Sequence, residues 1–212
     1  MKRTILFLIL SCSFLITFSQ KVEELTDNRG KRESFLKLQR KDVRNDLAAF
    51  TLTGVEETLF KGELTKIPYA EYGPNFMTYE GDDIKATVTT APFITGKHRM
   101  DYDEKYLIKI DRKPFYGDYG KMPKSYISNI TMTIGKDSIQ IPPSAYFDLY
   151  NLNFAFTDKE GAKRSTNGIY RSRDGSRIYL YLFCKDNSGS YEVTFVIENK
   201  KYAFRVLDYG FM

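Results

Sequence analysis

The chain has 212 residues, of which 28% are charged, and its 32 Lys and Arg against 27 Asp and Glu give a formal net charge of +5. The cationic residues are interspersed with carboxylates and form no sustained basic block, so we expect no nucleic-acid partner. One histidine and two cysteines exclude a His-rich or Cys-rich zinc site, and we expect neither a metal nor a cofactor.

The first 19 residues have the pattern of an export signal. Lys2 and Arg3 precede an apolar run from Ile5 to Phe18, and small residues lie at the −3 and −1 positions of a cleavage site after Ser19. This run is shorter than the roughly 20 apolar residues that span a bilayer. We therefore expect residues 1–19 to be removed, leaving a mature periplasmic or secreted chain without a transmembrane segment.

A second processing route is open at Cys12. Ile9-Leu10-Ser11-Cys12 resembles a bacterial lipobox, which would make Cys12 the lipid anchor of a lipoprotein. However, the apolar run continues to Phe18, where a lipoprotein usually has a polar tether. Removal after Ser19 uses the whole run and is the favoured prediction.

Residues 20–80 are predicted to be a helical and loop segment that packs on a sheet. Lys31 to Phe50 has the composition of one amphipathic helix, with Asn28 or Ser34 as its N-cap. Beyond it, Gly, Pro and Tyr punctuate residues 67–75, which indicates a connecting loop.

Residues 81–212 are predicted to form an antiparallel β domain. Alternating apolar and polar residues predict strands over Ile84–Thr90 and Tyr106–Ile110. A further hairpin is expected to have a four-residue loop from Gly135 to Ser138. That loop pairs Ile134 with Ile139 and Met132 with Ile141.

Two prolines end this hairpin, because proline cannot donate to a β-ladder. Ser144, which follows them, is predicted to be the N-cap of a short helical turn that extends to Tyr150.

The last forty residues predict a β-meander with three turns. Asp174-Gly175 suits a type I′ turn, Asn199-Lys200 closes a second two-residue turn, and Asp186–Gly189 forms a loop between them.

These turns set a register on one apolar face. The middle hairpin places Ile178, Leu180 and Leu182 opposite Ile197, Phe195 and Val193. The last hairpin places Ile197, Phe195 and Val193 opposite Tyr202, Phe204 and Val206. A slip by one residue would bury Glu192, Glu198 and Arg205 instead, which is costly if they are unpaired. The fold class is thus mainly β, an antiparallel sheet or two-sheet sandwich with one N-terminal amphipathic helix.

The other face of the meander carries Tyr170, Tyr179 and Tyr181 with Arg205. The favoured prediction is that the Lys31–Phe50 helix covers these tyrosines. The alternative is an exposed aromatic platform that binds a protein or a glycan, since tyrosine offers a rigid amphipathic contact. In that case Tyr170, Tyr179, Tyr181 and Arg205 are the binding residues.

Three segments of the C-terminal half resemble uncharacterised exported bacterial proteins. They are Tyr116–Pro123, Ile141–Tyr150 and Ser188–Ile197. The middle segment has the pattern of a strand that ends in proline, followed by Ser-Ala-aromatic-x-Asp-Leu. The resemblance implies a similar β-rich fold and transfers no activity.

No catalytic constellation stands out. Cys184 alternates in phase with the apolar strand residues and is predicted to be a buried hydrophobic residue, not a nucleophile served by His98. Asp118 and Asp148 could act as an acid–base pair, but a chain with this many carboxylates offers such a pair by chance. The leading hypothesis is an exported non-catalytic binding or structural module. The alternatives are a hydrolase acting on an envelope polymer and an inhibitor or immunity-like protein that uses the tyrosine face.

Overall fold

The computed structural model describes residues 23–24, 38–55, 63–117, 121–184 and 190–211. The predicted leader, the caps Asn28 and Ser34, the Asp186–Gly189 loop and Asp118 lie outside these residues. Within them, no helix has the length and apolar character needed to cross a membrane.

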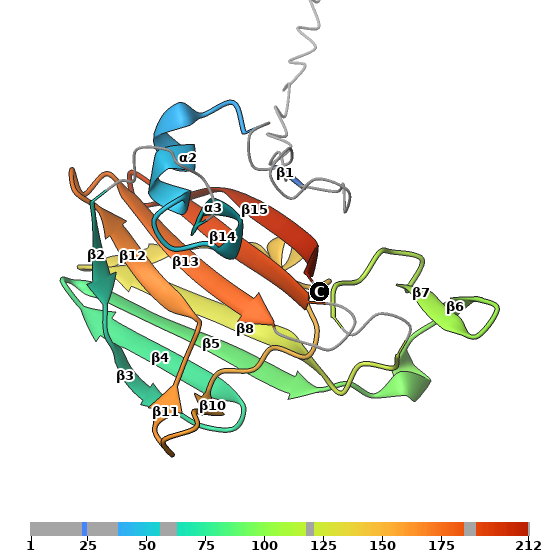
Figure 1. The fold of residues 1–212 in the computed structure, drawn as a ribbon. Helices are drawn as coiled ribbons and strands as arrows, with labels where there is room; N and C mark the ends of the chain where they lie inside the picture. The colour runs from blue at the N-terminus through green and yellow to red at the C-terminus, as the bar shows by residue number, and fades with distance from the viewer. Residues whose placement is uncertain (1–22, 25–37, 56–62, 118–120, 185–189, 212) are drawn as a thin grey trace, which may run out of the picture.

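Two β-sheets pack face to face, as Figure 1 shows. Sheet A has the order β1-β15-β14-β13-β12-β2, formed by Glu23–Glu24, Lys201–Phe211, Ser190–Glu198, Arg177–Cys184, Gly168–Ser172 and Leu64–Ile67. Sheet B has the order β3-β4-β5-β8-β9, formed by Tyr69–Tyr72, Phe76–Gly81, Ile84–Pro92, Ser125–Ile134 and Asp137–Ile139. All pairings are antiparallel except that of β1 with β15. The predicted mainly β class is confirmed.

The core lies between the two sheets because each contributes one apolar face. Ile84, Ala86 and Val88 of β5 are buried while the residues between them face outward. They meet the apolar face of β13 and β14, where Leu180 and Phe195 are fully buried. This packing follows from the two-residue period of a strand.

The chain passes from sheet A to sheet B at Pro68, which alone separates β2 from β3. The predicted connecting loop over residues 67–75 is therefore wrong at β3, which is a strand, and right at residues 73–75, which connect β3 to β4. The shortness of β2 and β3 and the proline between them conceal the alternation on which the prediction relied. Pro68 is compatible with a strand end because it needs no ladder hydrogen bond.

The middle hairpin of the meander has the predicted register. Ile178 pairs with Ile197, Leu180 with Phe195 and Leu182 with Val193. The Asn199-Lys200 turn is also confirmed, with positive φ at both residues.

The last hairpin departs from the prediction after Tyr202. A β-bulge shifts β15 by one residue, so that Phe195 pairs with Arg205 and Val193 with Leu207. The predicted partners Phe204 and Val206 lie on the other face of the sheet. The bulge adds one residue to β15 but none to β14. Each residue of β15 after the bulge therefore points to the face opposite the predicted one.

Two predicted turns differ in detail. The β8–β9 turn contains only Gly135 and Lys136, so Met132 pairs with Ile139 and Ile134 with Asp137. Gly135 has φ +61°, as a two-residue hairpin turn with glycine in its first position requires. At Asp174-Gly175 only Gly175 has positive φ, so this is not a type I′ turn.

The N-terminal helix is shorter than predicted. α2 spans Lys41–Leu47, residues 38–40 are not helical, and a four-residue helix α3 follows at Leu52–Val55. Leu47 and Val43, one turn apart, are buried against Tyr179 and Val196 on the outer face of sheet A. This segment forms a third layer over the meander (Figure 1).

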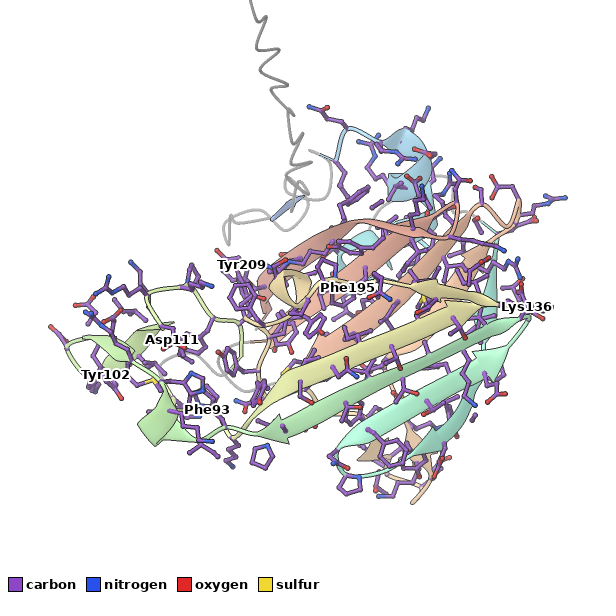
Figure 2. The ribbon with its side chains drawn as sticks, turned by 180° about the vertical axis from the view of Figure 1, so that it is seen from behind. Phe93, Tyr102, Asp111, Lys136, Phe195 and Tyr209 are labelled. Atoms are coloured by element: carbon purple, nitrogen blue, oxygen red, sulfur yellow. The ribbon has the colours of Figure 1, made fainter. Side chains whose placement is uncertain are left out.

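Between β5 and β8 the chain leaves the sandwich as a projecting arm. The arm has a 3-10 turn η1 (Thr95–Lys97) and a hairpin of β6 (Met100–Asp103) and β7 (Tyr106–Ile110). Figure 2 shows Phe93 and Asp111 near the base of the arm and Tyr102 farther out.

After β9, a 3-10 turn η2 (Pro143–Ala145) has Pro142, not the predicted Ser144, in its N-cap position. A small hairpin, β10 (Phe156–Thr157) with β11 (Lys163–Arg164), precedes β12.

Candidate functional site

A cavity of about 270 Å³ lies where the arm joins the sandwich. Four segments that are distant in the sequence meet around it: the start of the arm, its end, the start of β8, and the η2 turn with the residues that follow. Nine of its lining residues are apolar or aromatic and five are polar: Phe93, Ile110, Pro114, Tyr126, Ile127, Pro143, Tyr146, Phe147 and Tyr150, with His98, Asp111, Lys113, Ser128 and Asp148. A concave, mainly apolar site with a few polar groups is the usual form of a ligand pocket.

Backbone hydrogen bonds hold these segments together. Tyr116 N–H donates to the Asp148 carbonyl and Tyr150 N–H donates to the Tyr116 carbonyl, at 2.8 and 2.9 Å. On the other side, Ile127 N–H donates to the Leu149 carbonyl at 3.1 Å. The residues after η2 are therefore clamped between the end of the arm and β8.

Aromatic rings line one wall of the cavity. Tyr150 makes an edge contact with Phe93, with ring centroids 5.6 Å apart, and a similar contact with Phe115 at 5.9 Å. Lys113 Nζ lies 4.1 Å from the centroid of the Phe147 ring, a favourable cation–π distance. The charge of Lys113 is thus already placed against a ring of the protein.

His98, the single histidine of the chain, lies at the mouth. Its ring stacks on Phe93 with centroids 4.6 Å apart, and its Nδ1 lies 2.7 Å from Asp111 Oδ2. Because a carboxylate only accepts, this contact assigns the proton to Nδ1. Hydrogen bonds from His98 and from Arg99 N–H lower the pKa of Asp111.

The floor of the cavity includes Asp148, whose carboxylate is buried. Both of its oxygens accept hydrogen bonds from Arg205, at 2.6 and 2.7 Å, and Arg205 also donates to the Ala145 carbonyl. The Arg205 side chain is only 2% exposed. The bulge in β15 causes this contact, because it turns Arg205 from the outer face of sheet A into the core.

Two tyrosine hydroxyls remain available to a ligand. Tyr146 and Tyr150 line the cavity and are only 5% and 6% exposed. Neither hydroxyl is hydrogen-bonded to another group of the described chain. Burial and then the carboxylates of Asp111 and Asp148 raise the pKa of Tyr150 to about 12, so it is a neutral phenol at physiological pH. Both hydroxyls reach solvent, since neither belongs to the buried side-chain atoms of the described chain that lack a partner, and this makes them candidate ligand contacts.

The tyrosine face predicted from the sequence is covered. The ring of Phe50, which follows α2, stacks on Tyr170 at 4.3 Å and also contacts Tyr179 and Tyr181. Tyr179 and Tyr181 are 0% and 3% exposed, and Tyr170 is half-buried. The favoured prediction, that the N-terminal segment covers these tyrosines, agrees with this arrangement. The exposed platform does not, and Arg205 lies on the opposite face of the sheet.

Polar contacts hold the N-terminal segment of α2 and α3 on the tyrosine face. Tyr179 donates to Asp46 at 2.5 Å, and Arg177 pairs with the same carboxylate at 2.9 Å. Glu192 accepts hydrogen bonds from Tyr181 and from the backbone of α3. The hydroxyls of Tyr179 and Tyr181 are therefore hydrogen-bonded within the protein.

The cavity was missed by reasoning from the sequence. His98 and the segment Tyr116–Pro123 were noted separately, but no local pattern joins them to Tyr146 and Tyr150. Asp148 was noted as half of a carboxylate pair, yet its partner is Arg205. Among the described residues, no group of three or more His, Cys, Asp or Glu side chains is arranged to hold a metal ion.

No protein-family model matches the chain, and neither the curated proteins nor the solved structures contain a significant match.

Proposed function

We propose that the chain is an exported, non-catalytic binding module of the bacterial envelope or secreted fraction, and that its ligand places one ring-shaped group in the cavity. Export is the prediction from residues 1–19, with the lipid anchor at Cys12 as its alternative. Ligand pockets for drug-sized molecules measure about 300–1,000 Å³. A cavity of about 270 Å³ lies just below this range and suits one ring of a ligand.

The observation that supports binding most strongly is the pair of cavity-lining tyrosines, Tyr146 and Tyr150, whose hydroxyls have no hydrogen-bond partner within the described chain. A ligand in the cavity displaces water from these hydroxyls, so a ligand that replaces the lost hydrogen bonds binds better than one that does not. Fixed aromatic neighbours such as Phe93 reduce the entropy lost on binding.

A hydrolase acting on an envelope polymer is the second candidate, because a carboxylate that orients a histidine is part of many catalytic sites. The His98–Asp111 pair favours this reading. Asp148 argues against it, since both of its oxygens are held by Arg205 and are poorly placed to act as acid or base. The inhibitor hypothesis relied on an exposed tyrosine face and is not proposed further.

The single histidine gives a direct test of binding. The imidazole proton signals of His98 are unique in an NMR spectrum of this chain, and a ligand beside Phe93 should shift them. We expect at least one ring-bearing probe from a small panel of sugars and aromatic compounds to produce a saturable shift. Phe93→Ala should abolish the shift, while Tyr72→Ala on the exposed strand β3 should not. If no probe shifts the signals, or if both variants behave alike, the proposal is wrong. Release of reducing ends from an envelope polymer would instead favour the hydrolase.

A further inference from the structure

We infer that the ring bound in the cavity is a neutral pyranose, that is, one uncharged sugar residue of a glycan; this rests on the proposed function and names its ligand class. Three features of the cavity lead to this class: its charge, its hydroxyl groups and its aromatic faces.

The charges in and directly behind the cavity cancel. The cations Lys113 and Arg205 balance the carboxylates Asp111 and Asp148. Each charge also has a partner inside the protein, such as the Phe147 ring for Lys113. An anionic or cationic ligand would be desolvated without gaining an unmatched opposite charge.

The hydroxyl groups exclude a purely hydrocarbon ring. The hydroxyls of Tyr146 and Tyr150 each offer one donor and one acceptor, and neither has a partner within the described chain. An acyl chain or a phenyl ring would occupy the cavity without satisfying them. A pyranose carries several hydroxyls around its rim, and each can donate and accept.

The aromatic faces suit the remaining surface of a sugar. The two faces of a pyranose are largely C–H groups, which pack well against apolar and aromatic side chains such as those that line this cavity. A sugar thus satisfies the apolar wall and the polar hydroxyls together. An aromatic side chain of a peptide satisfies the wall alone.

The experiment follows the His98 signals while probes are added to the mature chain. The probes are methyl glycosides of glucose, mannose and galactose together with N-acetylglucosamine. Sodium glucuronate and N-acetyl-tyrosinamide are the charged and aromatic comparators. We expect at least one neutral sugar to bind more tightly than either comparator.

A hydroxyl-deletion variant tests the reason for the preference. Tyr150→Phe keeps the ring and removes one hydrogen bond, so the dissociation constant for the sugar should rise by about three- to tenfold. Binding of N-acetyl-tyrosinamide should change little. Tyr146→Phe is a second variant of the same kind, Tyr72→Phe is the exposed control, and circular dichroism checks that each variant folds.

The outcomes separate this inference from the proposed function. Tighter binding of N-acetyl-tyrosinamide than of every neutral sugar would refute the sugar class and leave a binding cavity. Tighter binding of glucuronate than of the glucoside would refute the charge argument. Absence of any shift with all probes would refute both.

Discussion

Removal of the Asp148 carboxylate should strongly destabilise the protein. Asp148→Ala deletes two hydrogen bonds of 2.6 and 2.7 Å to Arg205, whose guanidinium is 2% exposed. Breaking a buried ion pair by removing one partner costs about 3–5 kcal/mol. Total stabilities are about 5–15 kcal/mol, so the variant should lose a large part of its stability. It should also loosen η2, because Arg205 donates to the Ala145 carbonyl at the end of that turn.

Urea unfolding followed by circular dichroism measures this loss, since the chain has no tryptophan for fluorescence. The control is Glu80→Ala, which removes an exposed ion pair with Lys85 and should cost about 1 kcal/mol or less. The double variant Asp148→Leu with Arg205→Met should recover much of the lost stability, because an apolar pair of similar size avoids desolvation. A loss below about 1 kcal/mol for Asp148→Ala would show that this pair does not hold the turn to the sheet.

Three further predictions concern the N-terminal segment that covers sheet A and the buried tyrosines. Tyr181→Phe removes a 2.8 Å hydrogen bond to buried Glu192 and should lower the unfolding free energy by about 1–3 kcal/mol in urea titrations; an unchanged midpoint would contradict this. Burial raises the pKa of Tyr150 to about 12, above the unfolded value of about 10. Because the unfolded chain loses this proton first, stability should fall as pH rises from about 10 towards 12, and a flat stability profile over that range would disprove the assignment. Gly54→Ala should lower the melting temperature, since an added Cβ would lie 2.3 Å from a backbone atom at the end of α2; Gly96→Ala, with nothing within 4 Å, is the matched control and should melt like the parent.

The sequence by itself determined the elements whose side chains alternate strictly. Ile84, Ala86 and Val88 could be placed on one buried face because successive strand residues point to opposite sides. The apolar pattern of β13 and β14 likewise sufficed for the register of the middle hairpin, and the residues Asn199-Lys200 sufficed for the turn of the last one.

Only the tertiary structure decided the bulge in β15, the strands on either side of Pro68 and the cavity. A register without a bulge keeps Arg205 outside the core. The bulge turns Arg205 into the core, and the protein still folds because the carboxylate of Asp148, 57 residues away, pairs with the Arg205 guanidinium. The cavity depends in the same way on segments that meet through contacts remote in sequence, such as those of His98 with Asp111 and of Tyr116 with Asp148. Periodicity reports which face of an element is apolar, but it carries no information about which distant side chain will satisfy a buried charge or complete a pocket.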